Sequence, residues 1–353
     1  MIYNMPEYWL MKKAEPIVPY LTFSSPKSFT LAVKDATKHW DGTLEYSTDT
    51  TTWSTWDGTT ALSSATSGSD NVMYLRGTGN TVITGNNSNY RWVLTGSKVK
   101  SIGSIENLLD YATVESGAHP TMAQYCYYSM FYKCTSLTQA PALPATTLAE
   151  RCYAYMFQSC TALTQAPGLP ATTLANSCYD SMFEGCTSLT QAPELPVTML
   201  TDYCYYGMFY KCTSLTQAPA LPATTLTEGC YAYMFQGCTG LTQAPALPAT
   251  TLANNCYAYM FKSCTALTQI PALPATTLAT QCYRSMFYGC TGLKLSATQT
   301  GEYTVEYRIP SSGAGTTATN ALTDMFASTG GTFTGTPEIN TMYYLSNTNT
   351  IVG

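Results

Sequence analysis

Cysteine is the residue type in this sequence with the most chemistry to offer. The cysteines occur in pairs along the sequence, and seven residues separate the two members of each pair. This spacing is longer than that of a typical zinc site, and the chain has only 2 histidines, so the pattern does not predict structural zinc. An even number of cysteines permits disulfides, but in stacked copies each thiol would meet two equivalent neighbours and could pair with only one. We therefore predict two ladders of buried thiols that pack as small apolar groups. The two series, each with a spacing of 26 residues, are Cys126, Cys152, Cys178, Cys204, Cys230, Cys256 and Cys282, and Cys134, Cys160, Cys186, Cys212, Cys238, Cys264 and Cys290.

A repeated Thr-Gln pair is the best candidate for binding. Alternation along a short strand predicts that one residue of each pair points outward, which would give a row of identical uncharged donors and acceptors. Such a row suits a repeating ligand such as a polysaccharide, whereas glutamines that hydrogen-bond to one another would only stabilise the stack. Both alternatives stay open. The pairs are Thr138-Gln139, Thr164-Gln165, Thr190-Gln191, Thr216-Gln217, Thr242-Gln243 and Thr268-Gln269.

An invariant tyrosine follows the first cysteine of every unit. These rings could present an aromatic ladder to sugar faces, but packing between copies is the favoured interpretation, since tyrosine is amphipathic. The series is Tyr127, Tyr153, Tyr179, Tyr205, Tyr231, Tyr257 and Tyr283.

Catalysis, metal binding and cofactor binding find no support in the motifs. The sequence contains no nucleophile elbow, P-loop, zinc-protease helix or dinucleotide fingerprint. The acidic residues of the repeats, such as Asp180, Glu184 and Glu194, change from copy to copy and are typical of a solvated surface. The formal net charge is -5 and the basic residues are scattered, which disfavours nucleic acid as a partner. We predict a non-enzymatic protein without metal or cofactor, and no segment apolar enough for membrane insertion.

The elements that position these residues follow from an internal repeat. Met-Phe recurs at Met130, Met156, Met182, Met208, Met234, Met260 and Met286, always with 26-residue spacing. Leu148, Cys152, Met156 and Cys160 are four apart, so we predict one stripe of a helix, widened by Phe157. Thr147 with Glu150, and Thr225 with Glu228, predict capping boxes at the start of such helices. The predicted structural core comprises Cys126, Cys134, Met156, Phe157, Cys160, Met182, Phe183, Cys186, Cys212 and Cys238.

Pro167 and Pro170 end the helix predicted in that unit, and the residues Leu163 to Ala166 before them predict a short strand. One helix and one strand per 26 residues is the arrangement typical of leucine-rich repeats. We therefore predict an α/β solenoid with short parallel strands on a concave side and helices on a convex side.

The run Met-Phe-x-x-Cys-Thr-Ser-Leu-Thr from Met130 to Thr138, with its copies, resembles the BspA-like leucine-rich repeats of gut and oral bacteria. The resemblance covers roughly residues 120–296 and is specific because it recurs seven times in register. It implies a solenoid used for adhesion or recognition at surfaces. One departure is the Ala-Pro-x-Leu-Pro run, which replaces the family's apolar strand residues and predicts a shorter strand.

The flanking regions differ from the repeats. All 5 tryptophans lie in the first hundred residues, among short alternating segments such as Thr43 to Ser47 that are typical of an antiparallel β-sandwich. Near the other end, Glu302 to Ile309 alternates like a strand, and Met325-Phe326 resembles a degenerate eighth unit. We predict five parts: an N-terminal segment (1–16), an all-β sandwich-like domain (17–100), an N-terminal cap (101–120), seven repeat units (121–296), and a degenerate repeat with the C-terminal cap (297–353).

These features together predict a recognition or adhesion protein whose partner is a cell-surface polysaccharide or protein receptor. The first residues do not follow the secretory pattern, which slightly favours a phage-tail protein attached to a larger assembly through its N-terminal region. The alternatives are a bacterial surface adhesin and a purely structural spacer. A virion or extracellular surface is the expected location.

Overall fold

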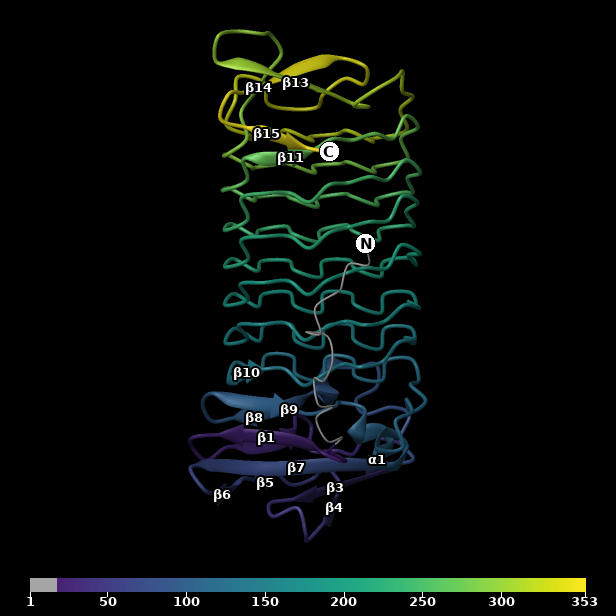
Figure 1. Cartoon of the computed structure of the whole chain (residues 1–353), viewed down its shortest axis with the longest axis vertical. Coiled ribbons are helices and arrows are strands. Elements are labelled where there is room, and N and C mark those ends of the chain that lie inside the picture. The colour runs from purple at the N-terminus through teal and green to yellow at the C-terminus, as the bar shows by residue number, and fades with distance from the viewer. Residues whose placement is uncertain (1–17) are drawn as a thin grey trace, which may run out of the picture.

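The repeats stack as a straight column of coils in a computed structural model that describes residues 18–353. Figure 1 shows the N-terminal sheets at one end of the column and strands β13 and β14 at the other. The predicted N-terminal segment and its signal-free pattern lie outside the described residues. We number the coils from residue 121 in steps of 26 residues, so that the third coil is residues 173–198.

The prediction of a helix in each repeat is wrong. In the described residues 18–353 the single α-helix is α1 (Asn107–Glu115), which precedes the repeats. The segment from Arg151 to Cys160 is instead a series of tight turns, with Arg151, Tyr155 and Ser159 at φ of 52° to 60°. A left-handed residue every four positions cannot belong to an α-helix, whose residues all have negative φ. The capping boxes predicted at Thr147 and Thr225 therefore cap no helix.

Backbone hydrogen bonds explain why the turns replace the helix. Tyr153 N–H donates to Cys178 O at 3.0 Å in the next coil, whereas Met156 N–H donates to Tyr153 O at 3.2 Å within its own coil. The same alternation recurs along the column, so half of the amide groups on this face bind the neighbouring coil. An α-helix pairs its amides internally and could not join its neighbour in this way. We call this surface the turn face.

The predicted division into concave and convex sides is also wrong, because the column in Figure 1 is straight. A curved repeat arises when helices about 10 Å wide oppose strands about 4.8 Å apart. Here hydrogen bonds join adjacent coils on both the turn face and the strand face, so both faces have nearly the same rise. The strand face carries β10 (Leu137–Gln139), β11 (Gln269–Pro271) and isolated parallel bridges such as Gln165 with Gln191.

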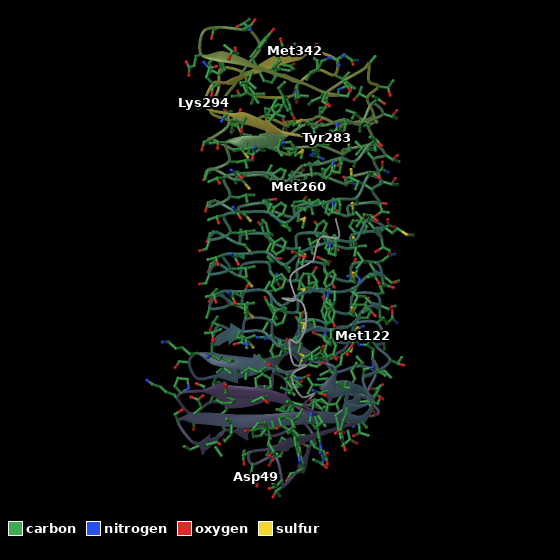
Figure 2. All side chains as sticks on the ribbon, viewed as in Figure 1. Asp49, Met122, Met260, Tyr283, Lys294 and Met342 are labelled. Atoms are coloured by element: carbon green, nitrogen blue, oxygen red, sulfur yellow. The ribbon has the colours of Figure 1, made fainter. Side chains whose placement is uncertain are left out.

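The interior of the column is filled by stacked copies of the same side chains (Figure 2). Phe131, Phe157 and their equivalents stack with ring centroids 5.5–5.8 Å apart as far as Phe326. The invariant tyrosines from Tyr127 to Tyr283 form a second buried stack at 5.6–5.9 Å. The invariant tyrosines therefore pack between coils rather than offering an aromatic surface to a ligand.

All fourteen cysteines are buried as free thiols. From Cys160 onward, each member of the second series donates from Sγ to a phenylalanine carbonyl of the preceding coil, as Cys186 does to Phe157 O at 3.1 Å. Cys134 of the first coil donates instead to Trp92 O at 3.3 Å. Burial raises the pKa of the Cys186 thiol to about 12, so it stays protonated and poorly reactive at neutral pH.

We expect protein denatured without reductant to take up close to 14 thiol labels, and the folded protein to take up very few. The expected difference arises because buried thiols become accessible only on unfolding. Mass spectrometry after alkylation measures both states, and prior reduction provides the control. Uptake near zero in the denatured protein would contradict the free-thiol ladders.

The N-terminal region forms two antiparallel sheets whose core continues into the first coil. Trp56 packs against Trp40 and Trp92 at 5.1 and 5.5 Å, and Trp92 in turn packs against Phe131 at 6.2 Å. A separate sandwich domain ending at residue 100 stays a prediction, because this core is shared with the repeats. The strands are β1 (Leu21–Ser25), β2 (Thr30–Val33), β3 (Thr43–Ser47), β4 (Ser54–Trp56), β5 (Leu62–Ser63), β6 (Ala65–Ser67), β7 (Asp70–Thr78), β8 (Trp92–Thr95) and β9 (Val99–Ile102).

One sheet has the order β10-β9-β1-β7-β3-β4, with β6 also paired to β7, and the other has the order β5-β2-β8. Strand β9 therefore lies between the antiparallel sheet and β10 of the first coil, and it pairs with β10 in parallel. The first coil's amide edge is thus covered, which prevents it from acting as an open sheet edge.

The last coil is covered by the chain that follows it. Phe287 N–H donates to Met325 O at 2.9 Å, and the two phenylalanines Phe287 and Phe326 stack at 5.5 Å, so the segment around Met325 forms a further coil. Strand β15 (Thr350–Val352) pairs in parallel with β11. The remaining strands, β12 (Leu295–Ser296), β13 (Tyr303–Arg308) and β14 (Met342–Ser346), form a small antiparallel sheet at this end.

Candidate functional site

The Thr-Gln pairs lie one per coil along the strand face. The chain turns into this face after the second cysteine, and a buried leucine such as Leu163 or Leu189 anchors each pair from inside. Thr164, Gln165, Thr190, Gln191, Thr216, Gln217, Thr242, Gln243 and Thr268 are exposed, while Thr138 and Gln269 are half-buried and Gln139 is exposed.

The expectation that only one residue of each pair points outward is therefore wrong. Strict alternation requires extended strands, and here most coils form only a single bridge at the glutamine, such as Gln217 with Gln243. The backbone bends directly afterwards at Ala-Pro. Both side chains consequently reach the surface.

Threonines of this row form hydrogen bonds to the preceding coil, whereas, in the part of the chain that the structure describes, the glutamine side chains do not bond to one another. Thr190 Oγ1 donates to Thr164 O of the preceding coil at 3.4 Å, and Thr268 Oγ1 donates to Thr242 O at the same distance. Within residues 18–353 no hydrogen bond joins the side chains of two of these glutamines. The glutamine amides are therefore the groups of this row that remain available to a ligand.

A polar groove of about 470 Å³ lies at the N-terminal end of the row. Two Thr-Gln pairs line it together with the exposed Lys100. Lys100 was not predicted as a site residue, because it falls at the end of the predicted sandwich-like domain (17–100). The alternating run from Lys98 was the only available signal that this side chain lies on a strand. Because β9 pairs with β10, Lys100 extends the row by one position and adds a positive charge. The lining residues are Lys100, Thr138, Gln139, Ala140, Thr164, Gln165, Ala166 and Pro167.

A second groove, of about 540 Å³, lies on the neighbouring proline-rich face and is lined mostly by Ala, Gly, Leu and Pro. Glu194 is the one charged residue in its lining, and no residue of the Thr-Gln row contributes to it. The two faces therefore offer a ligand contrasting chemistry: amides and hydroxyls on one, apolar surface on the other.

The residues predicted as structural core occupy that role. Cys126, Cys134, Met156, Phe157, Cys160, Met182, Phe183, Cys186, Cys212 and Cys238 are all buried, and none lines either groove. No helix among the described residues is long and apolar enough to cross a membrane.

A stacked column with uniform exposed rows defines this protein as a solenoid repeat protein. The family described as BspA type leucine-rich repeat region matches residues 87–216 and 176–304, with six copies. The chain therefore belongs to the BspA-type leucine-rich-repeat family, whose members are commonly repeat proteins of surfaces and adhesion. Comparisons with curated proteins and with solved structures gave no match.

Proposed function

We propose that this protein is a non-catalytic recognition protein that binds a cell-surface polysaccharide along the Thr-Gln row. The observation that carries the proposal is the set of exposed glutamine amides at the same position of successive coils. A polymer with a repeating set of hydroxyl groups can donate to and accept from one amide per coil. Many such bonds, each worth about 0.5–1.5 kcal/mol, would add to a useful affinity on a rigid surface.

Two biological settings fit a protein that binds polysaccharide on a cell surface. A phage-tail or tail-like particle would use the row to recognise bacterial surface polysaccharide, and its N-terminal sheets would attach to the particle. A bacterial adhesin would use the same row on host or neighbouring cells. A spacer function is a further candidate, favoured by the straight column and the uniformity of its coils (Figure 1).

Replacing Gln191 and Gln217 together by alanine should weaken binding about tenfold or more, because two central amides are lost. The melting temperature should change little, since both side chains are exposed. The matched control replaces Thr172 and Thr224 by alanine, because both side chains are exposed but lie outside the row. A large loss of stability in the Gln variant would instead support a structural role.

The binding assay uses fluorescently labelled protein on intact bacterial strains, and on mucin and matrix proteins. Periodate treatment of the cells destroys sugar diols, so loss of staining identifies a polysaccharide and retained staining a protein receptor. Selective staining of particular strains supports the tail-protein setting, and staining of mucin or matrix alone supports the adhesin. Staining of none of these targets would overturn the proposed recognition function in favour of the spacer.

A further inference from the structure

The turn face carries an outer row of tyrosines that is distinct from the buried stack. In each coil, at most one of the two residues after the invariant tyrosine is a further tyrosine. It is the first of the two for Tyr128 and Tyr206, and the second for Tyr155, Tyr233 and Tyr259. Where the second position is tyrosine, the first is a buried alanine, such as Ala154. We call this row the outer tyrosine ladder, and its members are Tyr128, Tyr155, Tyr206, Tyr233 and Tyr259.

Neighbouring rings of the outer tyrosine ladder are in contact. Tyr128 meets Tyr155 at 5.3 Å, Tyr206 meets Tyr233 at 5.1 Å, and Tyr233 meets Tyr259 at 4.7 Å. These side chains are half-buried, so their outer edges remain at the surface. The ladder thus forms two segments, one in the first two coils and one in the fourth to sixth coils.

The third coil interrupts the ladder with a carboxylate. Its two positions are Asp180 and Ser181, neither of which carries a ring. The prediction that Asp180 belongs to a solvated surface is wrong, because its side chain is only 7% exposed. Asp180 accepts hydrogen bonds from the Ser181 hydroxyl at 2.9 Å and the Tyr155 hydroxyl at 3.3 Å. No basic nitrogen of residues 18–353 forms an ion pair with Asp180. The charge of Arg151 acts on Asp180 through space, while Arg151 itself pairs with Glu150 at 3.9 Å.

A buried carboxylate without a cation is a costly arrangement that proteins rarely retain. The other coils show that tyrosine, alanine or arginine fits the position of Asp180. A side chain that breaks the local pattern at a cost in stability is a marker of function.

In the seventh coil, a guanidinium group takes the place of a ring at the position equivalent to Asp180. Arg284 occupies the position of Asp180 there, and its guanidinium lies over Tyr259 at 5.8 Å. Lys262 likewise lies near the rings of Tyr259 and Tyr288, at 5.4 and 4.8 Å. The tyrosines of the turn face therefore already stack with cations of this chain.

We propose that the interruption in the third coil binds the guanidinium group of an arginine on a protein partner, between Tyr155 and Tyr206 and against Asp180. The two rings belong to coils on either side of Asp180, and a planar guanidinium suits both ring faces and a carboxylate at once. Its charge-assisted bonds would displace the long Tyr155 hydroxyl bond, which is the weaker of the two that Asp180 accepts. The half-buried Glu184 of the same coil adds negative charge nearby. The site lies on the turn face and does not rest on the function proposed for the Thr-Gln row.

The test measures binding of a short fluorescent peptide with one arginine to the full-length chain, beside the same peptide with citrulline or lysine. Citrulline keeps the shape of arginine but lacks its charge, so we expect binding at least tenfold weaker. Lysine, which lacks the planar group, should fall between the two. Equal binding of the arginine and citrulline peptides, or no binding of either, would overturn the proposal.

Two substitutions at one position separate binding from folding. Asp180→Asn removes the charge, and Asp180→Tyr gives the third coil the Cys-Tyr-Tyr-Ser sequence of the first, which restores the ladder. Both variants should fold and bind the arginine peptide at least tenfold more weakly, with Asp180→Tyr the weaker. The variant with Gln191 and Gln217 replaced should bind the peptide as the original chain does. Unchanged binding by folded Asp180→Tyr protein would exclude the site.

Discussion

Replacing Phe209 by alanine is expected to lower the free energy of unfolding by about 3–5 kcal/mol. The Phe209 ring is fully buried and stacks on Phe183 and Phe235 at 5.8 and 5.7 Å, so its loss opens a cavity between two coils. Because backbone hydrogen bonds fix the spacing between neighbouring coils, the coils cannot approach each other to close this cavity. Urea unfolding followed by circular dichroism measures the change.

Phe209→Leu is the matched control, because it keeps most of the apolar volume and loses only the ring. We expect it to cost less than about 1.5 kcal/mol. In a column, each coil contacts mainly its neighbours, so amide exchange should rise first in the third to fifth coils. A loss below about 1 kcal/mol for the alanine variant would show that the stack contributes little beyond the backbone bonds.

Replacing Asp180 by asparagine is expected to stabilise the protein by about 3 kcal/mol at pH 7 and to have little effect at pH 4. Burial raises the pKa of Asp180 from 3.8 to about 6. The folded chain therefore holds this proton more tightly than the unfolded chain does. Stability contributed by protonated Asp180 is present below about pH 4, and it is lost as the pH rises through about 6.

Urea midpoints measured from pH 4 to pH 8 test this expectation. The original chain should lose stability across the window while Asp180→Asn loses less, so the two curves diverge. Glu194→Gln is the control, since Glu194 is an exposed carboxylate of the same coil. Parallel curves for the original chain and Asp180→Asn would mean that Asp180 is ionised at little cost.

The repeat predicted much of the architecture. The 26-residue spacing predicted a stacked solenoid, and the invariant Cys, Met, Phe and Tyr positions predicted its core. The alternation at Thr43 to Ser47 predicted a strand with the bounds of β3. The continuity of the N-terminal core with the first coil could not be read from the sequence, because it depends on long-range contacts such as Trp92 with Phe131.

The helix was mispredicted because a spacing of four residues fits two structures. Leu148, Cys152, Met156 and Cys160 would line one stripe of a helix, but a row of four-residue turns places them on the same side as well. The distinguishing signal is the recurrence of glycine, such as Gly185 and Gly237, at the left-handed positions, where φ is 70° and 75°. Other copies place Ser or Lys at this position, which hides the signal.

The sequence alone determined the period, the identity of the buried residues and the family to which the chain belongs, because these depend on which residues recur. The tertiary structure decided whether each coil forms a series of tight turns or an α-helix, and which faces are exposed. It also decided that Asp180 is buried without a cation. Those properties depend on how the amides and side chains of one coil meet the next, and bonds between coils outweigh the local preference for a helix.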